Sequence, residues 1–106
     1  MAVDVTKETF GEEVESSPGL VLVDFWGPAC VPCVALMPFV DELAGKLGQQ
    51  LKVVKVDASK NRRLCIDLKV MGLPTFLMYQ GGQEVGRLSG KEVNQEALAK
   101  FVGSHL

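Results

Sequence analysis

The most apolar stretch of the chain lies at residues 20–26, which read Leu-Val-Leu-Val-Asp-Phe-Trp. A short and almost continuous run of this kind is typical of a strand that is buried on both faces and therefore central in a sheet. Residues 51–57, Leu-Lys-Val-Val-Lys-Val-Asp, are rich in valine and predict a second strand. Asp24 is the one acid inside the first run.

Between these strands, apolar residues recur at three- and four-residue spacing after Cys30, as expected for an amphipathic helix. The positions are Leu36, Phe39, Val40, Leu43 and Leu47, and Gly48 is the expected C-cap. A strand, a helix and a second strand in this order predict a right-handed βαβ unit.

The remaining patterns are shorter. Residues 2–5 predict an edge strand, and Thr6 is expected to cap a helix with Phe10 and Val14 on one face. The later predicted elements are a short helix ending at Leu68, a hairpin of strands 75–79 and 84–89, and a helix at 94–102. Together the elements predict an α/β fold, in which a central mixed sheet of four or five strands has helices on both faces.

Composition and charge narrow the range of functions to expect of this chain. The 106 residues are enough for one domain with a buried core, so we expect a single domain over residues 1–106. A net charge of −2, without a long run of Lys or Arg, gives no indication of nucleic-acid binding. No apolar run approaches the roughly 18 residues of a membrane span, and the first residues lack the apolar core of a secretory signal. We therefore expect a cytoplasmic protein that does not bind membranes.

Candidate chemistry lies where the first strand ends. Gly27 and Pro28 stop the strand, and Cys30 and Cys33 follow at the start of the predicted helix. The unpaired N–H groups and the dipole of a helix start favour a thiolate, which is the reactive form of cysteine. The three-residue spacing brings the second sulfur close enough for a small disulfide. This pattern indicates a redox-active pair.

A structural metal pair is the alternative interpretation of the two cysteines. Structural zinc takes four ligands, commonly from two such pairs. The further candidates here are Cys65 and His105, which are unpaired and far apart in the sequence. We therefore expect no metal site. Three cysteines, an odd number, also argue against a secreted scaffold held together by disulfides.

Asp24 interrupts the apolar run that leads to the cysteines. A buried carboxylate without a partner is costly, so burial is expected to raise the pKa of Asp24 and keep it neutral much of the time. In a functional interpretation Asp24 accepts the proton of the Cys33 thiol through a water molecule. In the ordinary interpretation it is a strand-end aspartate that reaches solvent.

The residues around the cysteines resemble thioredoxin. Residues 23–33, Val-Asp-Phe-Trp-Gly-Pro-Ala-Cys-Val-Pro-Cys, match the strand and redox loop of that family. Further matches are Pro38 in the helix, Lys55-Val56-Asp57, Gly72-Leu73-Pro74-Thr75, Gly82 and Gly90. The resemblance runs from about Val5 to Leu106. It implies the thioredoxin fold and a thiol-disulfide oxidoreductase that reduces protein disulfides.

The same resemblance implies roles for single residues. Cys30 would be the exposed nucleophile and Cys33 the buried resolving thiol, and the functional interpretation of Asp24 is favoured. Pro74 would follow a cis peptide bond beside the disulfide, and Leu73 would offer its backbone to an extended substrate. A shallow apolar groove would be lined by Trp26, Pro28 and Gly90.

For Lys55 the ordinary interpretation is a side chain that reaches solvent from the face of the sheet. In the thioredoxin fold it would approach Asp24 and limit the rise of the carboxyl pKa. The resemblance also implies a monomer with no cofactor beyond its own disulfide, and with disulfide-containing proteins as substrates. A reductase, thioredoxin reductase in that family, would supply the electrons.

Three residues depart from the family pattern, which is Trp-Cys-Gly-Pro-Cys-Lys around the cysteines. Ala29 removes a large aromatic contact before Cys30, Val31 adds a branched side chain beside the exposed sulfur, and Val34 removes a positive charge. Two alternatives therefore stay open beside a reductase. One is an oxidant or isomerase on the same scaffold, because the dipeptide between the cysteines helps to set the reduction potential. The other is a binding module without turnover.

Overall fold

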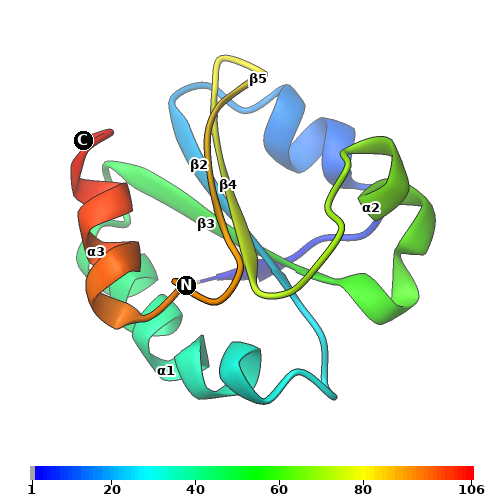
Figure 1. Ribbon diagram of the computed structural model, residues 1–106. Helices are drawn as coiled ribbons and strands as arrows, with labels where there is room; N and C mark the ends of the chain where they lie inside the picture. Colours follow the sequence, from blue (N-terminus) through cyan, green and yellow to red (C-terminus); the bar gives the residue numbers. More distant parts are fainter. Residues whose placement is uncertain (1) are drawn as a thin grey trace.

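The computed structural model describes residues 2–106 of the chain (Figure 1). The first half contains β1 (Val3–Asp4), a short π-helix η1 (Gly11–Glu15), β2 (Leu20–Trp26) and α1 (Val31–Lys46). The second half contains β3 (Leu51–Asp57), a 3-10 turn η2 (Ala58–Lys60), α2 (Arg62–Asp67), β4 (Thr75–Gln80), β5 (Gln83–Ser89) and α3 (Gln95–Gly103). No helix within residues 2–106 has the length and apolar character needed to cross a membrane.

The described residues form one five-stranded mixed sheet in the order β1-β3-β2-β4-β5. β1, β3 and β2 run parallel, and β4 and β5 add an antiparallel hairpin on the other side of β2. The predicted central place of the apolar strand is therefore confirmed, since β2 has two strands on its β3 side and two on its β4 side. The parallel pairing of β2 with β3 also confirms the predicted connection through α1.

Helices cover both faces of this sheet, as predicted (Figure 1). A hydrophobic core lies on each face of the sheet. Alternate residues of β2 belong to one core or the other, because successive side chains of a strand point to opposite faces. Leu22 packs in the core that contains the buried residues of α1 and α3, whereas Val21, Val23 and Phe25 pack in the core under η1 and α2. Asp24 follows Leu22 by two residues and therefore points to the same face of the sheet, toward α1.

Two local predictions are wrong. Thr6 does not cap a helix, because residues 7–9 form a turn and the helical segment begins only at Phe10. Gly48 does not cap α1, which ends at Lys46 with Leu47 as its C-cap. The N–H groups of Gln50 and Leu51 both donate to the Leu47 carbonyl (2.8 and 2.7 Å), so the chain leaves the helix through this turn without a left-handed glycine. Phe10 and Val14 are buried on one face, as expected.

Candidate active site

Cys30 and Cys33 form a disulfide at the start of α1. Cys30 is the N-cap, in an extended conformation (φ −90°, ψ 100°), and its sulfur accepts a hydrogen bond from the Cys33 N–H at 3.3 Å. The turn before it is held by the Cys30 N–H, which donates to the Gly27 carbonyl at 3.0 Å. Pro32 stands in the first helical turn, where its missing N–H costs no hydrogen bond. The predicted pairing of the two cysteines is confirmed.

The two sulfur-bearing residues differ in their access to solvent. Cys33 is 2% exposed, whereas Cys30 is partly exposed. Cys30 opens into a hollow of about 480 Å³ that is also lined by Pro28, Ala29 and Leu73. A partner protein can therefore reach the Cys30 sulfur from this hollow, while Cys33 is covered.

The loop before β4 passes directly beside this hollow. The Leu73–Pro74 peptide bond is cis, as expected. Leu73 lines both the hollow at Cys30 and a second one of about 220 Å³, which Pro32, Pro74 and Gly90 also line. The Gly90 N–H donates to the Pro74 carbonyl at 3.3 Å and holds the two loops together. Four of the five residues expected to contact a substrate thus line these two hollows, namely Pro28, Leu73, Pro74 and Gly90.

Asp24 lies inside the protein on the α1 face of β2. It is 2% exposed, and its Oδ2 atom has no hydrogen-bond partner within residues 2–106. Burial raises the pKa of Asp24 from 3.8 to about 7, and Lys55 opposes the rise while Asp41 adds to it. The ordinary interpretation of Asp24 as a solvated strand residue is therefore wrong.

Lys55 stands opposite Asp24 in the register of β2 and β3. Its ammonium nitrogen lies 3.9 Å from Asp41 Oδ1 and 3.9 Å from the sulfur of Met37, both on α1. The positive charge of Lys55 lowers the pKa of Asp24, which is the direction expected from the sequence. Lys55 therefore interacts electrostatically with Asp24 of the neighbouring strand and with Asp41 of α1.

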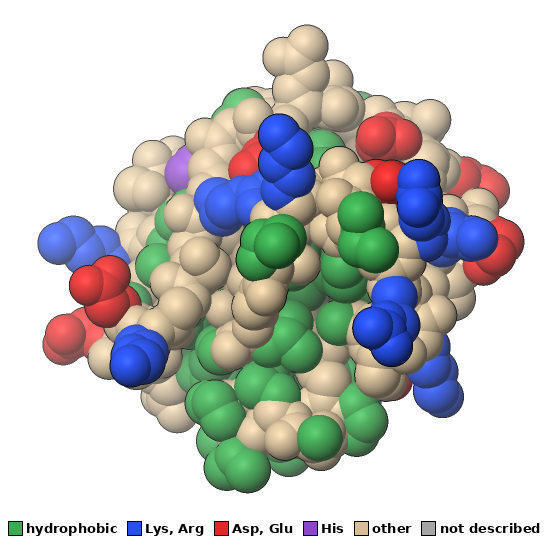
Figure 2. Space-filling model, turned by 45° about the vertical axis from the view of Figure 1, so that its right-hand side comes forward, with side chains coloured by type: hydrophobic (Ala, Val, Ile, Leu, Met, Phe, Trp, Pro, Cys, Tyr) green, Lys and Arg blue, Asp and Glu red, His purple; other side chains and the backbone are tan. Residues whose placement is uncertain are grey.

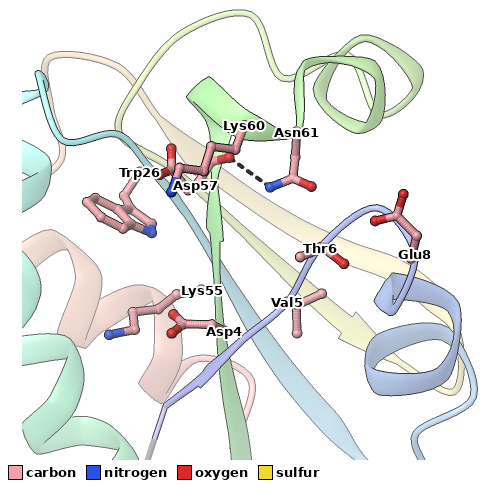
Figure 3. A pocket seen from close by; sticks show the side chains of 9 residues that line it. All are labelled: Asp4, Val5, Thr6, Glu8, Trp26, Lys55, Asp57, Lys60 and Asn61. Atoms are coloured by element: carbon pink, nitrogen blue, oxygen red, sulfur yellow. Dashed lines mark hydrogen bonds between the residues drawn. The ribbon is translucent and has the colours of Figure 1, made fainter.

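Trp26 lies apart from the groove residues. It lines a third hollow, of about 400 Å³, together with Asp4, Lys55 and Asp57 (Figure 3). This hollow is at the carboxyl ends of the parallel strands, and the indole Nε1 atom has no hydrogen-bond partner within residues 2–106. Trp26 does not line either hollow beside the disulfide, so its contact with a substrate stays a prediction.

The other two candidate metal ligands are not near the pair. Cys65 is a free, buried cysteine of α2 in the core under that helix, and His105 packs against Phe101 of α3 (ring centroids 5.1 Å apart) on the other face of the sheet. Residues 2–106 contain no cluster of three or more His, Cys, Asp or Glu side chains arranged to hold a metal ion. The arrangement at Cys30 and Cys33 is that of a two-electron thiol-disulfide couple.

Sequence reasoning missed one wall of the hollow beside Cys30, formed by Ala58, Ser59 and Arg62. A usable signal was present, because β2 and β3 are predicted to be parallel and the segments that follow parallel strands meet at one edge of the sheet. Residues just after β3 were therefore candidates for the surroundings of Cys30. It also missed Lys91 and Val93, which line the hollow at Pro74.

Comparisons with known proteins agree with this geometry. The thioredoxin family pattern matches residues 1–104. A thioredoxin from Acetoanaerobium sticklandii is 43% identical over 100 residues, which are 92% of this chain and 95% of that protein. A thioredoxin from Bacillus subtilis is 38% identical over 104 residues, which are 98% of this chain and 97% of that protein.

A longer relative is similar over one part of its length. A bifunctional thioredoxin reductase/thioredoxin from Mycobacterium leprae is 38% identical over 90 residues, which are 85% of this chain and 20% of that protein. The fold, the Cys30–Cys33 disulfide at a helix start and these similarities agree. The chain belongs to the thioredoxin family and is a thiol-disulfide oxidoreductase that reduces protein disulfides through a Cys-x-x-Cys pair.

Proposed function

We propose that Cys30 attacks the substrate and that Cys33 resolves the mixed disulfide. The Cys30 thiolate attacks one sulfur of the substrate disulfide, and the other substrate sulfur leaves as a thiolate that takes up a proton. The Cys33 thiolate then attacks Cys30, releases the second substrate thiol and forms the Cys30–Cys33 disulfide. The protein loses two electrons and the substrate gains them.

The observation that carries this assignment is the difference in access between the two cysteines. Cys30 opens into the hollow beside the turn, whereas Cys33 is 2% exposed. The hydrogen bond from the Cys33 N–H to the Cys30 sulfur favours negative charge on Cys30 in the reduced protein. Attack by Cys33 on a protein substrate would first require the helix start to move.

We propose that Asp24 accepts the proton of Cys33 through water during the second step. A group with a pKa of about 7 can take up and release protons near neutral pH, which an ordinary aspartate cannot. Its burial on the α1 face and its unpaired Oδ2 atom support this role. Lys55 acts through Asp24 as a positioning residue, since its charge keeps the carboxyl pKa from rising further.

The substrate is proposed to lie extended across Leu73, with Pro28, Pro74 and Gly90 around it. These residues line the two hollows on either side of Leu73. We further infer a monomer of one domain that works in the cytoplasm and receives its electrons from a thioredoxin reductase. The relative that joins a thioredoxin reductase to a thioredoxin in one chain supports this donor.

Trapping of mixed disulfides tests the assignment of the cysteines. The Cys33→Ser variant should accumulate a covalent complex with a disulfide protein such as insulin, visible on non-reducing gels and by mass spectrometry. The Cys30→Ser variant is the matched control and should trap little. Equal trapping by the two variants would show that the assignment is wrong. Equilibration of the wild type with glutathione buffers then separates a reductase from an oxidant, because a strong oxidant would keep its dithiol reduced in buffers that oxidise a reductase.

A further inference from the structure

A further hollow continues from the one beside Cys30 along α2. Both are lined by Ala58, Arg62 and Leu73, so they share a wall. The continuation has a volume of about 310 Å³, and its remaining lining residues are Cys65, Ile66, Val70, Met71 and Gly72. We call the two hollows together the α2 trough. Cys30 lies in one part of it, and the other part is a mostly apolar recess.

The recess is bordered by large apolar side chains that are open to solvent. Met71 is 90% exposed and Ile66 is 62% exposed. Apolar side chains that gather on the surface in this way mark sites of interaction with other molecules. Figure 2 shows hydrophobic side chains gathered in the lower half of this view, with lysine and arginine side chains above them and to both sides. The α2 trough is therefore continuous with the surface that a disulfide substrate must contact.

Arg62 adds a charge to the shared wall. Neighbouring Arg63 forms an ion pair with Asp67 (3.3 Å), and Arg63 lines neither hollow. Within the described residues 2–106, Arg62 makes no ion pair with a carboxylate. A guanidinium between two apolar hollows is complemented by an acidic side chain on the partner.

We propose that the α2 trough selects disulfide substrates whose reacting cysteine has a large apolar side chain and an acidic side chain nearby in an extended segment. The apolar side chain fills the recess between Ile66 and Met71, and the acidic side chain pairs with Arg62. The occupant is thus a segment of the disulfide-containing protein itself. This selectivity rests on the proposed attack by Cys30, since it places the segment relative to that sulfur.

The test uses symmetric disulfide-linked peptide dimers that carry one cysteine per chain. The parent peptide carries Ala at about four positions on either side of the cysteine. One set of peptides replaces each Ala in turn by Leu, and a second set replaces it by Glu or by Lys. The rate constant kcat/KM for each peptide is divided by that for bis(2-hydroxyethyl) disulfide, which has neither side chain. The variants Ile66→Thr and Met71→Gln remove apolar surface without adding charge, and Val85→Thr, at a half-exposed valine of β5, is their matched control.

The wild type should prefer Leu over Ala by about tenfold at the best position, and Ile66→Thr and Met71→Gln should lower this preference to about twofold. It should prefer Glu over Lys by about threefold, and Arg62→Glu should reverse that order. Val85→Thr and Arg63→Glu should keep both preferences. Peptides reduced at one common rate by the wild type, or preferences that survive in the trough variants, would overturn the inference while leaving the proposed function intact. Failure to reduce the small disulfide as well would overturn the proposed function and the inference with it.

Discussion

Replacement of Asp24 by Asn should make the stability of the protein much less dependent on pH. Asp24 is 2% exposed, and its pKa is about 7 in the folded protein against 3.8 for the free side chain. Each tenfold change in proton affinity is about 1.4 kcal/mol, so this displacement corresponds to about 4 kcal/mol. The buried carboxyl therefore lowers the free energy of unfolding at neutral pH by up to about this amount.

The sign follows from proton linkage. Because the folded pKa lies above the unfolded pKa, the unfolded state loses its proton first as the pH rises. The wild type therefore loses stability from about pH 4 up to about pH 7, and the loss levels off above the folded pKa. An asparagine side chain keeps the shape of the aspartate and does not ionise, so the Asp24→Asn variant escapes this loss. The stability of the variant relative to the wild type should rise by about 4 kcal/mol between about pH 4 and about pH 8.

Urea unfolding of the oxidised wild type and variant at several pH values measures this difference. All other titrating groups are shared by the two proteins, and any constant cost of burying the Asn amide cancels in the comparison across pH. Single-turnover reduction of a peptide disulfide by the reduced proteins gives the second readout. Release of the substrate from Cys30 should slow by about tenfold to 100-fold in the variant. A stability difference that does not change with pH, together with an unchanged rate of release, would refute the reasoning.

Three further predictions concern charge, backbone conformation and helix capping. Lys55→Met removes the charge that lowers the pKa of Asp24, so carboxyl-carbon NMR should place that pKa above its wild-type value of about 7, and an unchanged value would contradict the coupling. Gly82→Ala should cost at least about 2 kcal/mol in urea unfolding, because φ is +83° and the new Cβ would lie 2.7 Å from a carbonyl oxygen of η1, whereas Gly81→Ala, with φ +60° and free space, should cost about 1 kcal/mol. Asn94→Ala removes the side chain that accepts a hydrogen bond at the start of α3 and should cost about 1 kcal/mol, which thermal unfolding would detect.

The elements with strong hydrophobic patterns were predictable from the sequence. The apolar run of β2, the valine-rich β3 and the helix between them occupy the predicted places. The two local errors, at Thr6 and Gly48, concern caps. A capping preference contributes only about 1 kcal/mol. The packing of each helical segment, and not its cap residue, therefore decides where the chain enters and leaves it.

The active site was predictable to different extents. Cys30 and Cys33 are close in sequence, so a strand end and a helix start are enough to place them together. Pro74 and Gly90 lie in loops of distant segments and line the hollow next to the one at Cys30, and the resemblance to thioredoxin was needed to include them. Arg62 was missed, because the side of the hollow that it lines forms only when α2 packs beside the turn at Cys30, and the parallel order of β2 and β3 was the one sequence signal that pointed there.

The sequence by itself determined which strand is central, where the helix begins and that a reactive sulfur stands at its start, because these features depend on neighbours in the chain. The apolar neighbours of Asp24 favoured its burial, but whether it is buried or reaches solvent was decided by the tertiary structure, in which it is 2% exposed. The value of its pKa was decided by the tertiary structure, which sets Lys55 of β3 and Asp41 of α1 against the same carboxyl. Periodicity specifies which face of an element is buried, but the groups that meet across that face are chosen by strand order and helix packing.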